Sequence, residues 1–92
     1  MDTYVAVMYE NNWYIGVVEA ENVEKEEVFV NFMESKGGNK FAWPKHADKL
    51  SVPIVDIIGV LSKPCKYYKY WKMSRKEYLR VVADFHKRIV VA

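Results

Sequence analysis

The sequence predicts a mostly β domain that ends in one α-helix, and three observations support this fold class. First, β-branched and aromatic residues gather in short runs separated by Asn, Gly and acidic residues, which is typical of consecutive antiparallel strands. Second, apolar residues recur at helical spacing near the C-terminus, after a Ser-x-x-Glu sequence that favours a helix start. Third, a chain of 92 residues with 15% aromatics is long enough for one small, well-filled core.

Three strands are expected in the first third of the chain, at residues 4–9, 13–20 and 27–33. The polar turn Glu10-Asn11-Asn12 joins the first two, because Asn tolerates left-handed backbone angles. The first strand carries no charge, so both of its faces are expected to be covered. Gly16 falls inside the second strand, where it indicates a bulge or a close approach of another backbone.

The middle of the chain is expected to complete the sheet. The turn signal Gly37-Gly38-Asn39 is the strongest in the sequence. Residues 41–44 then predict a short strand that Pro44 ends, because proline cannot donate to a ladder. Residues 46–50 are predicted to form a single helical turn. The most apolar run follows, and a closing strand is expected at residues 56–61.

The last third of the chain predicts a connector and a helix. Residues 65–73 are aromatic and basic and are expected to be extended or irregular. Ser74 and Glu77 form a capping box that starts a helix over residues 75–89. Its apolar side consists of Tyr78, Val82, Phe85 and Ile89, with Leu79 and His86 beside them. We predict that residues 1–62 form the β domain. Residues 63–92 form the connector and the helix, which pack on this domain or extend from it.

Charge is unevenly divided between these two parts. The net charge is +2, but residues 1–62 sum to −5 and residues 63–92 to +7. The single cysteine, Cys65, cannot form an internal disulfide and fits a reducing compartment. No signal segment is visible and no apolar run approaches the ~20 residues of a membrane span. An intracellular protein, nuclear or cytoplasmic, is therefore expected, without membrane contact.

The order of these pieces resembles the Tudor family of small SH3-like barrels. The matching pieces are Ala6-Val7, Glu10-Asn11-Asn12, Trp13-Tyr14, residues 28–32, Gly38-Asn39 and Asp48-Lys49-Leu50. The resemblance covers about residues 3–61 and implies a five-stranded SH3-like (Tudor-like) barrel. For the methyl-reading members it also implies a cage of aromatic side chains that holds a methylated Lys or Arg by cation–π attraction.

The resemblance implies cage positions at Met8, or Tyr9 if the register slips by one residue, and at Tyr14 and Phe32. The fourth position falls in residues 34–36, which contain no aromatic. Trp13 or Trp43 could lean in instead.

Each of these aromatics also has a purely structural interpretation. Phe32 is expected in the core because its neighbours Val28 and Val30 look buried, with the cage as its alternative. Trp13, next to a turn, is the best candidate for an exposed aromatic. Trp43 is either a lid over one end of the barrel or a wall of the ligand site. Asn39 either binds the ligand or shapes its turn.

A second group of residues combines cations with aromatics, a pattern typical of nucleic-acid binding through phosphate attraction and base stacking. Its members are Lys63, Lys66, Lys69, Trp71, Lys72, Arg75 and Lys76. The alternative is that Tyr68 and Trp71 pack the connector on the barrel while the lysines stay in water.

The sequence contains no catalytic or metal-binding pattern. His46 and His86 lie far apart, Cys65 has no base at local spacing, and no phosphate-binding glycine loop is present. No enzyme activity, cofactor or metal is expected. The sequence instead predicts a binding module for a peptide, with methylated Lys or Arg as a candidate ligand, in chromatin or RNA–protein assemblies. The alternatives are binding of DNA or RNA through residues 63–80, and homodimerisation or scaffolding through the C-terminal helix.

Overall fold

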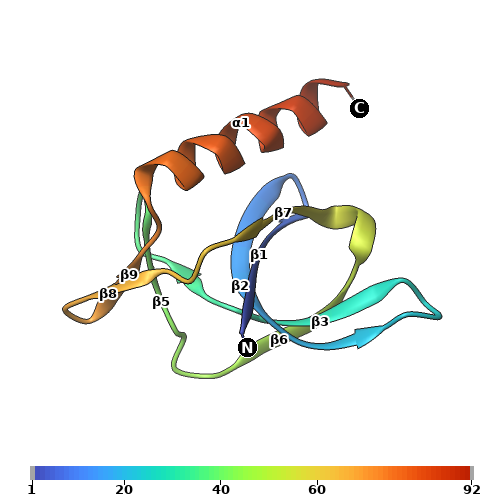
Figure 1. Cartoon of the computed structure of the whole chain (residues 1–92), viewed down its shortest axis with the longest axis horizontal. Helices are drawn as coiled ribbons and strands as arrows, with labels where there is room; N and C mark the ends of the chain where they lie inside the picture. The colour runs from blue at the N-terminus through green and yellow to red at the C-terminus, as the bar shows by residue number, and fades with distance from the viewer. Residues whose placement is uncertain (1, 92) are drawn as a thin grey trace.

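The structure is a computed structural model that describes residues 2–91. Met1, the first residue of the predicted β domain, and Ala92, the last residue of the predicted helical part, lie outside the described residues. Over this range the chain forms two antiparallel sheets followed by a helix (Figure 1). The mostly β fold class with a C-terminal helix is therefore confirmed.

The larger sheet has five strands in the order β6-β3-β2-β1-β7. These strands are β1 (Thr3–Tyr9), β2 (Asn12–Asn22), β3 (Glu27–Phe32), β6 (Asp48–Pro53) and β7 (Ile57–Leu61). The strands predicted at residues 4–9, 13–20, 27–33 and 56–61 correspond to β1, β2, β3 and β7. Consecutive antiparallel strands in the first third of the chain are thus confirmed.

The turn between β1 and β2 is a tight two-residue hairpin. Glu10 and Asn11 both have positive φ, 49° and 64°, and Tyr9 already pairs with Asn12. Two positive φ values are typical of a type I′ turn, whose twist matches that of the adjoining strands. The tolerance of Asn for this conformation explains why the polar turn lies here.

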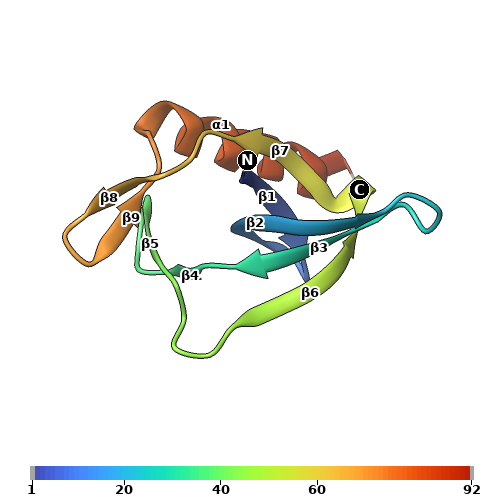
Figure 2. The ribbon, with the colours of Figure 1, turned by 60° about the horizontal axis from the view of Figure 1, so that its bottom comes forward.

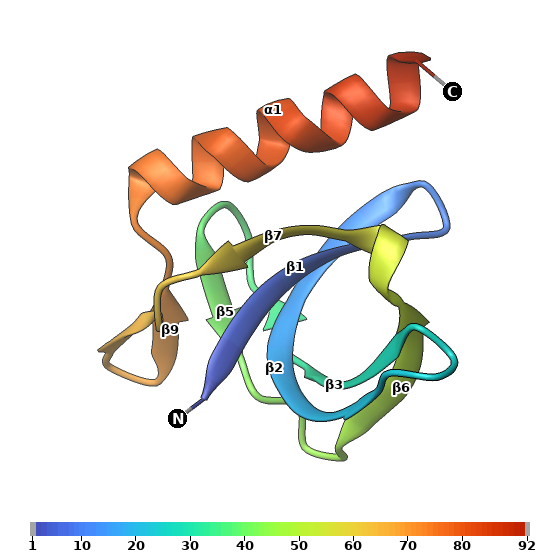
Figure 3. The same cartoon turned by 45° about the vertical axis from the view of Figure 1, so that its right-hand side comes forward.

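Strand β2 curls, and Gly16 lies at a point of close contact with β3. A Cβ atom at Gly16 would lie 2.5 Å from the carbonyl oxygen of Asn31, so the close backbone approach predicted for this glycine is present. Further along, the register with β3 shifts between Val18 and Ala20, which marks a β-bulge. The bulge and the tight contact let one long strand follow the curvature of the sheet (Figure 3).

The helical turn predicted at residues 46–50 is wrong. Residues from Asp48 onward form β6, which pairs with β3 over its whole length, from Glu27↔Pro53 to Phe32↔Asp48. In β6 a single side chain, Val52, is buried, and the apolar alternation is limited to Leu50 and Val52, which is too short to indicate a strand. Pairing with β3 decides the conformation instead.

The smaller sheet has the order β4-β5-β9-β8 and joins distant parts of the chain. Its strands are β4 (Glu34–Ser35), β5 (Lys40–Ala42), β8 (Cys65–Tyr67) and β9 (Tyr70–Lys72). The short strand predicted at residues 41–44 ends at Ala42, before Pro44. The connector at residues 65–73 is more regular than predicted, because it folds into the β8–β9 hairpin, seen at one end of the molecule in Figure 2.

The structure does not confirm the predicted five-stranded barrel. The larger sheet is curled, and the 3₁₀ turn η1 (Ile54–Asp56) links its two edge strands, β6 and β7. Within residues 2–91 these two edges do not pair, so the sheets are not closed into a barrel.

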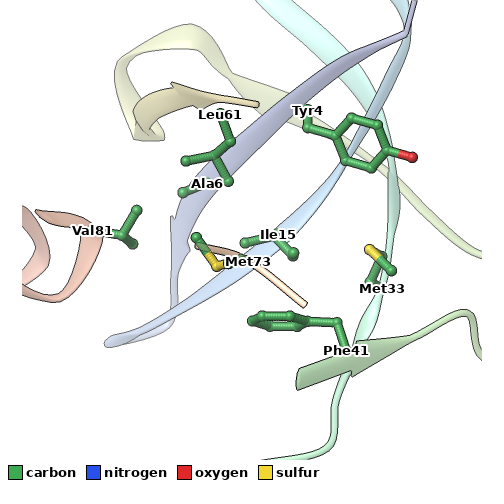
Figure 4. Close-up of a cluster of buried hydrophobic side chains, with 8 residues drawn as sticks. All are labelled: Tyr4, Ala6, Ile15, Met33, Phe41, Leu61, Met73 and Val81. Carbon is green, nitrogen blue, oxygen red and sulfur yellow. The ribbon is translucent and has the colours of Figure 1, made fainter. Parts of the chain in front are cut away.

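Both faces of β1 are buried, as its uncharged sequence predicted. One face contributes Tyr4 and Ala6 to a cluster shown in Figure 4, together with Ile15, Met33, Phe41, Leu61, Met73 and Val81. The other face contributes Val5 and Val7 to a cluster with Val28, Val30, Phe32 and Val52. The first cluster joins the larger sheet to the smaller sheet and the helix, whereas the second draws on the larger sheet alone.

Helix α1 (Arg75–Val91) begins where predicted and runs two residues beyond its predicted end. Ser74 Oγ accepts a hydrogen bond from the Glu77 N–H, 3.1 Å away, so the N-cap half of the capping box is confirmed. The Glu77 carboxylate accepts a hydrogen bond from the Ser62 N–H at 3.0 Å instead of reaching back along the helix. Glu77 thus connects the helix start to the segment after β7.

No helix within residues 2–91 is long and apolar enough to cross a membrane.

The helix packs on the larger sheet. Val81 and Phe85 are buried, while Ile89 of the predicted apolar face remains exposed. Arg88 donates hydrogen bonds to the carbonyl oxygens of Val55 and Ile57, at 2.6 and 2.9 Å. The central part of the helix's apolar face is therefore already covered within one chain.

The Ser74 cap gives a first testable prediction. Replacing it, Ser74→Ala, leaves an N–H of the first turn without its partner and should lower the free energy of unfolding by about 1 kcal/mol. Ser74→Asp keeps a capping oxygen and should preserve stability. Urea unfolding followed by circular dichroism measures both, and equal losses in the two variants would contradict a capping role.

Candidate functional site

Two tyrosine side chains and one phenylalanine side chain come together where the strands of the larger sheet end. Tyr9, Tyr14 and Phe32 line a pocket of about 370 Å³, with Asp48 and neighbouring β6 residues completing the wall. The pairing register explains this: Tyr14 lies opposite Val7, two residues before Tyr9, and Phe32 pairs with Asp48. Adjacent ends of the strands in the curled sheet thereby bring together aromatics that are far apart in the sequence.

The three rings differ in how much surface they offer to a ligand. Tyr9 and Tyr14 are 42% and 38% exposed, whereas Phe32 is 6% exposed and belongs to the second core cluster. The rings of Tyr14 and Phe32 meet edge-on, with centroids 6.3 Å apart and planes at 76°. This perpendicular arrangement is typical of adjoining walls of an aromatic pocket and is favourable between aromatic rings.

The pocket lining carries one acidic and one basic side chain, Asp48 and Lys49. Asp48 is exposed at its rim, and the ammonium of Lys49 is already paired with Glu19, 3.0 Å away. The negative charge of Glu10 raises the pKa of Tyr9. The site therefore offers neutral ring surfaces beside carboxylates, a combination that favours a cation.

A second pocket, of about 550 Å³, adjoins the first. Tyr14 and Asp48 line both, and the second extends past Trp13, Phe41 and Tyr78 toward the helix. The Trp13 ring contacts Phe41 and Tyr78, with centroids 6.2 and 5.8 Å away. These rings pack against one another, so we regard the larger pocket as an extension of the aromatic site.

Of the other residues predicted for the aromatic site, Trp13 lines only the extension, and Met8 and Trp43 line neither pocket. Met8 pairs with Trp13 on the face opposite to Tyr9, so of the two alternatives Tyr9 is the one at the pocket. Trp13 is half-buried, so the prediction that it is the exposed aromatic is wrong. Trp43 is 38% exposed and lines neither pocket.

Asn39 holds two segments of the backbone together. Its side-chain Nδ2 donates to the Met73 carbonyl at 2.8 Å, and its carbonyl accepts from the Met73 N–H at 3.0 Å. This pair joins the turn before β5 to the residue before the helix cap. The side chain thus has a structural partner, in keeping with the conformational role considered for it.

The basic residues predicted for nucleic-acid binding lie around the β8–β9 hairpin and the start of α1. Lys66 Nζ lies 5.1 Å from the Trp71 ring centroid, and Trp71 packs against the first core cluster, so this ring is used structurally. Lys63, Lys72 and Lys76 line a pocket of about 660 Å³ together with Arg80 and Glu77. Lys69 lies at the hairpin tip and Arg75 begins the helix.

The residues that sequence reasoning missed are those of β6. Asp48, Lys49 and Leu50 line the aromatic pocket, but their expected helical turn gave no reason to place them beside Tyr14. Recognising residues 48–53 as a strand paired with β3 would have revealed them.

No family model matches this chain, and no curated protein and no solved structure matches it. In the part of the chain that the structure describes, no group of three or more His, Cys, Asp or Glu side chains could hold a metal ion.

Proposed function

We propose that the chain is a non-catalytic binding module that takes a methylated Lys or Arg side chain of a peptide into the pocket of Tyr9, Tyr14 and Phe32. The observation that carries this proposal is that these three rings, from three different strands, line one pocket together with Asp48. Methylated side chains are the ligands that suit such a pocket in chromatin or RNA–protein assemblies.

The physical basis is the match between a weakly hydrated cation and aromatic faces. Methylation leaves the positive charge of an ammonium in place while reducing its hydration, so transfer from water to a ring-lined pocket costs less. Each contact between a cation and a ring contributes about 0.5–2 kcal/mol, depending on desolvation. The Asp48 carboxylate adds attraction and can accept a hydrogen bond from a lower methylation state that retains an N–H.

The adjoining pocket supports a peptide over an isolated small cation. Because Tyr14 and Asp48 line both pockets, a cation held at Tyr9 leaves its flanking residues next to the volume of about 550 Å³ beside Trp13. This second pocket extends from Tyr14 past Trp13 toward Tyr78 of the helix. Peptide residues next to the modified side chain are expected to lie along it.

The arrangement of strands supports a Tudor-like barrel for this module. The order β6-β3-β2-β1-β7 keeps strands β1, β2 and β3 adjacent and brings the last two strands to the edges. The three-residue η1 turn connects these edges, as expected for a small barrel that closes through a short 3₁₀ segment. We propose that β6 and β7 complete an SH3-like barrel around the second core cluster.

The proposal is tested with short peptides that carry one lysine, unmodified, dimethylated or trimethylated, and a matching arginine series. We expect at least one methylated peptide to bind about tenfold more tightly than its unmodified counterpart, measured by NMR chemical-shift titration, with shifts at Tyr9 and Tyr14. Equal affinity for modified and unmodified peptides would overturn the proposal.

A variant pair separates the pocket from other exposed aromatics. Tyr14→Ala removes a wall shared by both pockets and should reduce the affinity for the methylated peptide at least tenfold. Tyr67→Ala removes a tyrosine of similar exposure, 49%, from the distant hairpin and should leave that affinity unchanged. Unchanged binding by Tyr14→Ala, with a folded spectrum, would place the ligand elsewhere.

A further inference from the structure

The β8–β9 hairpin presents a surface of aromatic rings and lysines that is separate from the aromatic pocket. Directly paired residues of neighbouring strands project from the same face, so Tyr67, Tyr70 and Lys72 share a face with Lys40 of β5. Lys72 Nζ lies 4.3 Å from the Tyr67 ring centroid, and Lys40 and Lys69 Nζ lie 5.9 and 5.5 Å from that of Tyr70. We call this set, with Tyr68, the hairpin surface.

Tyr68, at the tip of the hairpin, has an unusual conformation for a bulky residue. Its φ is 55°, and its side chain is 81% exposed. A non-glycine residue in this left-handed region costs roughly 1–2 kcal/mol, and Gly or Asn would fit the turn better. The Tyr68 ring meets the Tyr67 ring edge-on, with centroids 4.7 Å apart, and is otherwise exposed. A strained backbone that displays a ring to solvent favours a role in binding.

The charge around the hairpin surface indicates an anionic partner. Residues 63–76 contain Lys63, Lys66, Lys69, Lys72, Arg75 and Lys76 and no Asp or Glu. The positive surface continues into the pocket of about 660 Å³ lined by Lys63, Lys76 and Arg80. Glu77 at that pocket accepts a hydrogen bond from Ser62 and pairs with Arg80 at 3.6 Å, so its charge is partly neutralised.

We propose that the hairpin surface binds single-stranded nucleic acid, with bases stacked on Tyr68 and Tyr67 and phosphates held by the surrounding lysines. Exposed aromatic rings beside cations are the combination that single-strand binding uses. A duplex keeps its bases stacked inside and would leave these rings unused, whereas an acidic peptide would use the lysines alone. Trp71 is not part of the stacking surface, because its ring packs toward the core.

Fluorescence anisotropy with labelled oligonucleotides tests this proposal on the full chain. Oligouridine and oligothymidine of about ten nucleotides are compared with a duplex of the same length and with a polyglutamate peptide. We expect the single strands to bind more tightly than either competitor, and the two single strands show whether RNA or DNA is preferred. With about four phosphates contacted, affinity should fall roughly 50-fold from 50 to 200 mM salt. Absence of binding at the lower salt, or equal affinity for duplex or polyglutamate, would overturn the proposal.

Variants separate stacking from charge. Tyr68→Asn keeps a residue that tolerates positive φ, so the fold should be retained while affinity for the single strand falls about tenfold with little change in salt dependence. Trp43→Asn removes an exposed ring that lines neither the aromatic pocket nor its extension, so it is the control and should bind as the wild type does. If Tyr68→Asn binds the oligonucleotides unchanged, the stacking role is wrong.

A lysine pair provides the corresponding charge test. Lys69→Gln with Lys72→Gln should make the salt dependence shallower by about 0.7 in log–log slope for each phosphate that the variant no longer neutralises. Lys25→Gln with Lys45→Gln removes the same charge from exposed positions outside the hairpin surface and should change neither slope nor affinity much. Equal effects of the two pairs would mean that the attraction is only the general charge of the protein.

Discussion

Gly16→Ala is expected to lower the free energy of unfolding by about 3 kcal/mol, because the added methyl has no room. The Cβ would lie 2.5 Å from the Asn31 carbonyl oxygen and 2.7 Å from a methyl carbon of Val30. The first neighbour is backbone of β3, held by ladder pairing at Val17↔Asn31 and Gly16↔Phe32, so it cannot move without disturbing the sheet. The strain should therefore reach the end of β3, where Phe32 lies.

Gly59→Ala is the matched control for this prediction. Gly59 lies in β7, no atom is found within 4 Å of its hypothetical Cβ, and its φ is not in the left-handed region. Adding the same methyl there should change stability by less than about 1 kcal/mol. Urea unfolding of the two variants measures the difference. Similar losses would show that the contact between β2 and β3 at Gly16 is looser than the distances indicate.

The strands that could be predicted from sequence are those whose own residues carry the signal. β1 has an uncharged β-branched run, and Glu10-Asn11 has the residues that a tight turn needs. Gly16 was recognisable because glycine within a strand usually marks close contact. In each case the local chemistry and the tertiary environment favour the same conformation.

The elements that sequence reasoning missed depend on partners far away in the chain. β6 is exposed apart from Val52 and is held by β3, and the β8–β9 hairpin is completed by pairing with β5. Tyr68 occupies a turn position where sequence rules expect Gly or Asn, so no local signal predicted that turn. Long-range pairing supplied the information that the local sequence lacked.

The residues of the candidate site also divide into those that the sequence predicts and those whose environment depends on distant parts of the chain. Tyr14 and Phe32 were predicted from the resemblance, and Tyr9 was one of two alternatives that the pairing register separates. Trp13 was expected to be exposed because it follows a turn, but Phe41 and Tyr78 cover its ring. Tyr78 comes from the helix, and no local pattern around Trp13 predicts that a helix packs there.

Phe32→Ala is expected to cost about 3–5 kcal/mol, because it removes a ring that is 6% exposed and leaves a cavity in the second core cluster. For a small domain this is a large part of the total free energy of unfolding. Chemical denaturation measures the loss. A cost below about 1 kcal/mol would show that the ring belongs to the pocket alone and contributes little to the core.

Phe32→Leu separates the structural role of the ring from its proposed role in binding. Leucine keeps most of the apolar volume, so the fold should be retained at a cost of about 1–2 kcal/mol. It lacks the π face, so affinity for a methylated peptide should fall about five- to tenfold. Phe29→Leu is the control, since Phe29 lies on the same strand but pairs with Ser51 on the opposite face. If Phe32→Leu binds the methylated peptide as tightly as Phe29→Leu does, the aromatic face of Phe32 is not a wall of the cation site.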